Sequence, residues 1–157
     1  MDAADNGDLT EVQNLLKRPD VDVNFGDEGN QTALWKASFH GHERVVQLLA
    51  EHPNVDVNKA KNDGATPLYV AGQQGQTDCV SLLLAHPQIE VNKARNDGTT
   101  PLIMAACKGL TEVMRRLLNV PEMDVNAKYS GKTAEEWARK KGHTEIADAI
   151  RARSRRS

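Results

Sequence analysis

Short blocks of apolar residues alternate with longer polar stretches along the chain. In residues 77–85, Cys79, Val80, Leu83 and Leu84 occupy positions i, i+1, i+4 and i+5, so on a helix they would form one apolar stripe. In residues 88–92 polar and apolar residues alternate instead, as expected of an extended segment. The pattern therefore predicts short amphipathic helices that are separated by extended loops.

The same pattern recurs every 34 residues. A Val-Asn dipeptide, a proline and a glycine all keep this spacing. The asparagines are Asn24, Asn58, Asn92 and Asn126, the prolines Pro19, Pro53, Pro87 and Pro121, and the glycines Gly7, Gly41, Gly75 and Gly109. A fixed period in this size range predicts an array of stacked structural repeats.

Each unit of the array is predicted to contain two helices and a hairpin-like loop. In the third unit, Thr66 would cap the first helix and Pro67 would occupy its first turn. Gly75 would end this helix with a positive φ. The second helix is expected over residues 77–85. In the loop that follows, the Asn-Asp-Gly sequence at 96–98 favours a tight turn.

These observations predict an all-α fold and one domain over residues 1–157. The expected units are 1–25 (a truncated first unit), 26–58, 59–92, 93–126 and 127–153 (a final unit), followed by a basic tail at 154–157. In the final unit, Glu135 and Arg139 replace an apolar and a small residue, as suits a terminal repeat that meets water. The short first unit fits either an atypical terminal repeat or a piece of a longer array.

The units carry the motif D-G-x-T-P-L-x-x-A-x-x-x-G, then an L-L pair and V-N, which resembles the ankyrin repeat of about 33 residues. The resemblance covers nearly the whole chain. It implies a solenoid of stacked helix-turn-helix units with β-hairpin loops. Two departures are visible: Trp35, Tyr69 and Ile103 stand where the family usually has histidine, and one extra loop residue lengthens each unit.

The resemblance also implies a non-enzymatic module that binds a protein or peptide through its concave side. That side would consist of the loop tips and the exposed side of each first helix. The tip positions are Glu28, Gln31, Asn62, Asp63, Ala65, Asn96, Asp97, Thr99, Tyr129 and Ser130. The helix positions are Phe39, His40, Gln73, Gln74, Cys107, Lys108, Lys140 and Lys141.

Aromatic residues would gather in the N-terminal half of this surface, and lysines in its C-terminal half. Trp35, Phe39 and Tyr69 would be the aromatic anchors, with Phe25 in the preceding loop. Trp35 and Tyr69 could equally pack between repeats. Two alternative functions stay open: a reader of basic or methylated peptides with an aromatic cage, and a structural segment of a longer array without a partner of its own.

Composition changes this interpretation little. The chain is 39% hydrophobic and 27% charged, with a net charge of −2, which gives no overall bias toward nucleic acid or membranes. Two cysteines and an acidic N-terminus fit a monomeric cytoplasmic or nuclear protein better than a secreted one. The terminal sequence RARSRRS is expected to be a frayed, solvated end, with a nucleic-acid or nuclear-import patch as the alternative.

Candidate chemistry is sparse. His40 and His42 have no third metal ligand nearby in sequence, and Cys79 and Cys107 have no implied base. No phosphate-binding loop is present, so no enzymatic activity, cofactor or small-molecule substrate is expected. The Val-Asn asparagines are expected to bind loop backbone. The resemblance also makes them candidate substrates of an asparaginyl hydroxylase, which prefers a leucine eight residues earlier, as at Leu16, Leu84 and Leu118.

Overall fold

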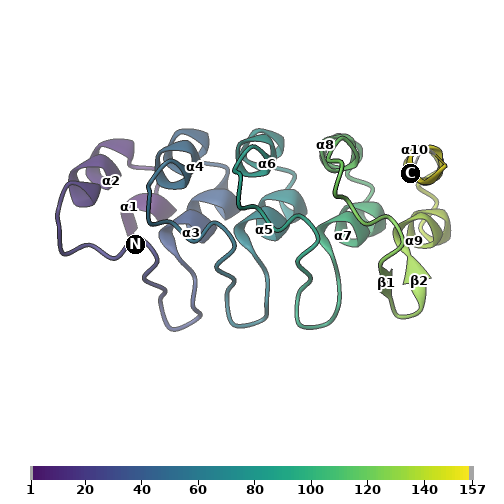
Figure 1. Cartoon of the computed structure of the whole chain (residues 1–157), viewed down its shortest axis with the longest axis horizontal. Coiled ribbons are helices and arrows are strands. Elements are labelled where there is room, and N and C mark those ends of the chain that lie inside the picture. Colours follow the sequence, from purple (N-terminus) through teal and green to yellow (C-terminus); the bar gives the residue numbers. More distant parts are fainter. Residues whose placement is uncertain (1, 156–157) are drawn as a thin grey trace.

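The computed structural model describes residues 2–155, which form pairs of helices stacked side by side in one row (Figure 1). First helices make the middle layer, second helices lie above them, and the loops project below (Figure 1). The first helices are α1 (Asp2–Asp5), α3 (Ala33–His40), α5 (Pro67–Gln73), α7 (Pro101–Lys108) and α9 (Ala134–Lys140). The second helices are α2 (Leu9–Leu16), α4 (Glu43–Ala50), α6 (Thr77–Leu84), α8 (Thr111–Leu118) and α10 (Thr144–Ser154). The predicted all-α array of helix pairs is confirmed.

The threonine caps form as the sequence predicts. The hydroxyl of Thr32 accepts a hydrogen bond of 3.1 Å from the backbone N–H of Trp35, and Thr66 accepts one of 3.1 Å from Tyr69. Such bonds satisfy N–H groups that have no partner within the helix. At the other end, α5 stops at Gln73, and Gly75 follows with a φ of +74°. The predicted stop therefore lies within two residues of the observed one.

One apolar core runs through all units. The leucines that follow the threonine caps, Leu34, Leu68 and Leu102, are each 1% exposed. The second helices contribute a matching stripe, which includes Val46 and Leu83. Each helix pair thus buries its apolar side against the neighbouring pairs, and the core is continuous from one end to the other.

The loops follow the predicted hairpin path, but most lack paired strands. Among the described residues only the last loop contains them, as β1 (Lys128–Tyr129) and β2 (Lys132–Thr133). There Ser130 and Gly131 both have positive φ, the turn geometry that matches the twist of a two-stranded ribbon. In the loop before α5, Asp63 instead accepts the N–H of Ala65 through its carboxylate, at 3.0 Å. The predicted β-hairpins therefore have paired strands in the last loop, whereas the other described loops follow the hairpin path without a strand pair.

The C-terminal end is more ordered than expected. Helix α10 continues to Ser154, and Arg153 donates hydrogen bonds to the carbonyl oxygens of Leu118 and Pro121, at 3.3 and 3.0 Å. The expectation of a frayed end is thus wrong for residues 151–154, while the last two positions of the predicted basic tail lie outside the described residues. None of the described helices is long and apolar enough to cross a membrane.

Candidate binding surface

The tips of the loops before α3, α5 and α7 are tied to one another by backbone and asparagine hydrogen bonds. The side-chain amide of Asn62 donates to the carbonyl oxygen of Glu28, and that of Asn96 donates to the carbonyl oxygen of Asn62, both at 3.0 Å. The backbone N–H of Asn62 donates to Gly29, also at 3.0 Å. These bonds fix the spacing between successive tips.

The asparagines of the Val-Asn dipeptides make a second series of links, nearer the helices. The side-chain amide of Asn58 donates to the carbonyl oxygen of Gln88 at 2.7 Å, and its oxygen accepts the N–H of Glu90 at 2.9 Å. Asn24 and Asn92 make the same pair of bonds to the following loops. The predicted backbone-binding role of these three residues is confirmed, whereas hydroxylation stays a prediction.

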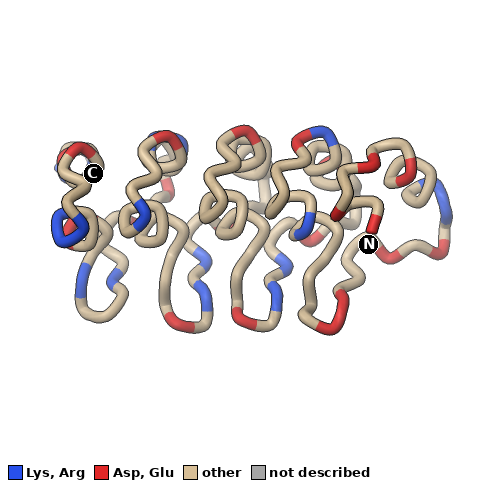
Figure 2. The backbone as a smooth tube through the Cα atoms, turned by 180° about the vertical axis from the view of Figure 1, so that it is seen from behind, with Lys and Arg blue, Asp and Glu red and all other residues tan. Residues whose placement is uncertain are grey.

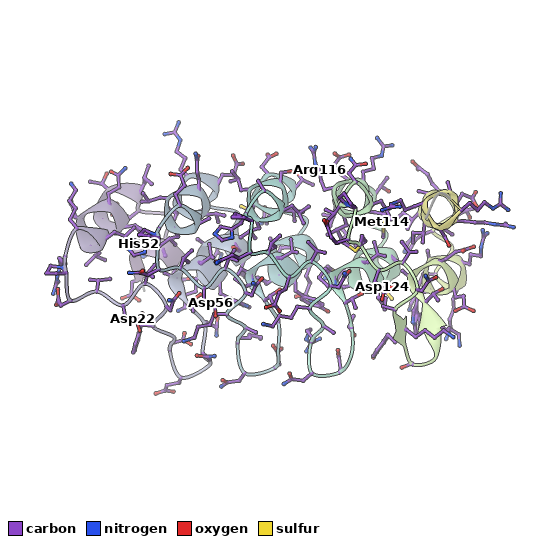
Figure 3. All side chains as sticks on the ribbon, viewed as in Figure 1. Asp22, His52, Asp56, Met114, Arg116 and Asp124 are labelled. Carbon is purple, nitrogen blue, oxygen red and sulfur yellow. The ribbon has the colours of Figure 1, made fainter. Side chains whose placement is uncertain are left out.

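Aspartates placed two residues before the asparagines brace the same loops. Asp22, Asp56 and Asp124 each accept the backbone N–H of the asparagine that follows, at 2.9, 3.0 and 2.8 Å. Figure 3 labels these three aspartates, which lie in corresponding parts of their units. The recurring acidic residues are therefore parts of turns and are not arranged as a paired acid and base.

Two of the predicted aromatic anchors are buried. Trp35 is 6% exposed and Tyr69 is 2% exposed. Nε1 of Trp35 donates a hydrogen bond of 3.0 Å to the carbonyl oxygen of Ala65 in the next unit. The expectation that Trp35 and Tyr69 are surface anchors is therefore wrong, and the alternative, that they pack between repeats, describes what the structure shows.

The faces of these two rings are covered by the protein's own cations. Nζ of Lys61 lies 5.3 Å from the ring centroid of Trp35, and Cζ of Arg95 lies 5.6 Å from that of Tyr69. Both cations attract the electron-rich ring faces. The proposed aromatic cage for a methylated lysine is thus not open in this structure, because Lys61 and Arg95 already lie where a ligand's cation would bind.

The predicted site residues differ in how much of each reaches the surface. The exposed ones are Glu28, His40, Asn62, Gln74, Asn96, Asp97 and Lys108; Gln31, Phe39, Asp63, Gln73, Cys107 and Tyr129 are half-buried; Trp35, Ala65, Tyr69 and Thr99 are buried. The last four were wrong as contact side chains, because their alternation within the loop or their position on the helix turns them toward the neighbouring unit. We call the other thirteen residues the binding surface.

Of the three predicted aromatic anchors, Phe39 is the one that remains in the binding surface. Its ring stacks on Trp35, with centroids 5.5 Å apart, and meets His40 edge to face at 4.9 Å. His40 in turn lies 3.0 Å from the carboxylate of Asp5, measured from Nε2 to Oδ1. The stacking on Trp35 and the contact with His40, which is itself held by Asp5, keep Phe39 in a fixed position at the edge of the surface.

The loop tips carry a charge network. Lys61 and Arg95 both contact the carboxylate of Asp63, at 3.2 and 3.1 Å, and Arg95 also contacts Asp97 at 3.3 Å. Partial burial acts to raise the pKa of Asp63, but the N–H of Ala65 and the two cations outweigh it, so this pKa lies below its usual range. The acids at the tips of three loops are visible in Figure 2.

One feature of the N-terminal end was missed from the sequence. An apolar hollow of about 240 Å³ lies between α1, α2 and the following loop, and its lining includes Ala4, Val12, Leu16 and Phe25. Phe25 is 61% exposed. No signal in the sequence indicated this hollow, because its lining comes from two helices and a loop that only the fold brings together.

The described residues show no group of three or more His, Cys, Asp or Glu side chains that could hold a metal ion. Cys79 is buried, and burial, with Glu43 and Asp78 nearby, raises the pKa of its thiol to about 11. Burial likewise raises the pKa of Cys107. A raised pKa keeps a thiol protonated and poorly nucleophilic at neutral pH.

The stacked units agree with a comparison against known families. A family model described as ankyrin repeats in three copies matches residues 1–95 and 88–154. Ankyrin repeats generally serve as protein–protein interaction modules and generally lack enzymatic activity. Because the two matches together span almost the full length, the chain belongs to the ankyrin-repeat family.

Proposed function

We propose that this chain binds a protein or peptide partner through the binding surface. The observation that carries the proposal is a row of exposed side chains at equivalent positions of successive units. His40, Gln74 and Lys108 lie at the C-terminal ends of neighbouring first helices, or directly after them, and all three are exposed. Helices α3, α5 and α7 contact one another in this order, so the row is continuous.

The backbone that presents this row is held rigidly. The tip bonds made by Asn62 and Asn96 and the deeper bonds made by Asn58 leave little freedom between adjacent loops. A surface that is ordered before binding loses less conformational entropy when a partner binds. The arrangement therefore favours a rigid platform that recognises side chains of a partner, in preference to a loop that folds around it.

Phe39 is the proposed anchor within the surface. It is half-buried, so part of its ring remains available, and its position is fixed by Trp35 and His40. Partly exposed aromatic rings in fixed positions commonly dominate the free energy of protein binding. The neighbouring Gln73 and Gln74 offer amide donors and acceptors that would orient a bound segment.

The test is affinity capture from the source cell followed by quantitative mass spectrometry. The bait variant carries Phe39→Ala and Gln74→Ala, and its control carries Arg44→Ala and Gln47→Ala on the exposed side of α4. We expect the first bait to lose its partners, with an affinity at least about tenfold lower. The control should retain them. Equal capture by both baits, at equal thermal stability, would exclude this surface as the binding site.

A further inference from the structure

The cations on the loop side of the array fall into two groups. Between residues 26 and 99, carboxylates of the chain itself contact Lys36, Lys61, Lys93 and Arg95, whereas Lys59 has no carboxylate at salt-bridge distance among the described residues. Lys36 contacts Asp27 at 3.2 Å and Lys93 contacts Glu90 at 3.1 Å. The pairs made by Lys61 and Arg95 with loop aspartates, described above, follow the same rule.

Five lysines at the C-terminal end are not neutralised in this way. Within residues 2–155, no carboxylate lies within salt-bridge distance of any of them. We call them the C-terminal lysine patch: Lys108, Lys128, Lys132, Lys140 and Lys141. Four are exposed and Lys132 is half-buried. Their charges therefore face solvent without an intramolecular counter-charge in contact.

The helix part of the patch lies on two adjacent first helices. Lys108 ends α7, Lys140 ends α9, and Lys141 caps α9. The two helices pack against each other. Nζ of Lys108 donates to the carbonyl oxygen of Gln73, at 3.1 Å, which keeps it on the binding surface. Figure 2 shows several backbone stretches coloured for Lys and Arg in the final unit, near the C-terminus.

The loop part of the patch is joined to the helix part through two neighbouring aromatic rings that are tilted relative to each other. Nζ of Lys140 lies 4.9 Å from the ring centroid of Trp137, and this ring lies 5.8 Å from that of Tyr129. Nε1 of Trp137 also donates to the carbonyl oxygen of Tyr129, at 3.0 Å. Tyr129 sits in the β1–β2 hairpin with Lys128 and Lys132, so these two lysines and Lys140 belong to one connected part of the final unit.

The acids of the final unit are already engaged elsewhere. Glu136 accepts the backbone N–H of Thr133 at 2.7 Å in a capping box, and Glu135 and Asp148 both contact Arg139. Hydrogen bonds from Thr133 lower the pKa of Glu136, with smaller contributions from Lys128 and Lys132. None of these carboxylates is at salt-bridge distance from the five lysines, so the patch keeps a positive excess.

Exposed carboxylates lie at the N-terminal end of the array. Asp2 and Glu28 are exposed there, and neither of them forms an ion pair with another described residue. A phosphate backbone that followed the whole surface would meet these carboxylates, and the chain has a net charge of −2. This charge distribution favours a partner whose own charge changes along its length over a uniformly negative nucleic acid.

We propose that the C-terminal lysine patch binds an acidic segment of the protein partner, and that the two oppositely charged ends fix the direction in which this partner lies. The inference rests on the proposed binding function and specifies the chemistry of the partner. Aspartate and glutamate side chains would pair with Lys108, Lys140 and Lys141. Such pairs steer association and select orientation more than they raise affinity.

The test uses the full chain and two labelled probes, followed by fluorescence anisotropy. One probe is a glutamate-glycine peptide and the other a single-stranded DNA of equal charge. The patch variant is Lys108→Glu with Lys141→Glu. The control is Lys17→Glu with Arg44→Glu, which changes the net charge equally at exposed positions around the second helices α2 and α4.

We expect the peptide to bind wild type at low salt and the patch variant at least about tenfold more weakly, with the control close to wild type. Absence of saturable peptide binding, equal losses in both variants, or tighter binding of DNA than of peptide would each overturn the inference. The captured natural partner separates the two proposals. If Phe39→Ala with Gln74→Ala releases it while the patch variant retains it, the binding function stands and the acidic-segment inference fails.

Discussion

The indole N–H of Trp35 and the carbonyl oxygen of Ala65 form a hydrogen bond of 3.0 Å across the junction between two consecutive units. Lys61, which lies in the same loop as Ala65, covers the face of the indole ring. The indole ring of Trp35 thus contacts the next loop twice, through the N–H at its edge and through the face that Lys61 covers. Trp35 therefore contributes to the alignment of the binding surface without being part of it.

Replacement of Trp35 should act on stability. We expect Trp35→Phe to lower the free energy of unfolding by about 1–2 kcal/mol, because the carbonyl oxygen of Ala65 loses one of its two donors, the other being the N–H of Lys61, and the smaller ring fills the buried site less well. Urea unfolding followed by circular dichroism measures this change. Phe25→Ala is the control, since Phe25 is 61% exposed, and its effect should stay within about 0.5 kcal/mol. Equal stability of the two variants would contradict the assigned role.

Gly75 and Gly109 provide a matched pair, since both have a φ of +74°. A methyl group on Gly109 would lie 2.6 Å from Cε1 of His143, whereas one on Gly75 would meet no atom within 4 Å. Gly75→Ala should therefore show only the backbone strain of about 1–2 kcal/mol. Gly109→Ala should cost at least about 1 kcal/mol more, because His143 must move. Thermal unfolding of both variants tests this order, and equal melting temperatures would refute it.

Asn58 and Asn126 form a second pair. Asn58 is 7% exposed and binds the next loop through both its amide and its oxygen. Asn58→Ala should lower the free energy of unfolding by about 1–3 kcal/mol, because two backbone groups lose their partner. The side chain of Asn126 is exposed and forms no hydrogen bond with another described residue, so Asn126→Ala should change stability by less than about 0.5 kcal/mol. A similar loss in both would show that the links do not stabilise the array.

Cys79 should make stability depend on pH in the alkaline range. Its pKa is about 11 in the folded chain, against 9.0 for the free thiol. The folded state therefore holds the proton more tightly, so the stabilisation is complete below pH 9.0 and declines as the pH rises to about 11. Cys79→Val should remove this part of the decline. Urea unfolding at a series of pH values measures it, and identical slopes for wild type and variant would contradict the prediction.

The repeating parts of the fold could be predicted well from the sequence. The threonine caps, the glycine stops and the apolar stripe of each second helix depend on residues close together in the chain, and their periodicity reinforced each prediction. The family, the all-α architecture and the path of the loops followed from them. Short-range sequence signals sufficed because successive helix pairs use similar caps, stops and apolar stripes.

The errors concern contacts between units, which local sequence does not encode. Trp35 and Tyr69 occupy positions that looked exposed, but each ring packs against the loop of the next unit. The carboxylate of Asp63 takes an N–H that a strand pair would have used. Arg153 likewise binds carbonyl groups more than thirty residues earlier. For Trp35, Tyr69 and Arg153 a partner one unit away decided the outcome, and for Asp63 a bond within its own loop did.

The asparagine links have a consequence for how such an array can change in length. Asn24, Asn58 and Asn92 each bind the same two backbone positions of the following loop, so the three junctions that they link are chemically interchangeable. Deleting one complete period would place an asparagine next to a loop that offers the same two backbone groups as the deleted one. Deleting half a period would leave the asparagine side chain without these backbone groups. The array can therefore gain or lose whole periods without losing these asparagine–backbone hydrogen bonds.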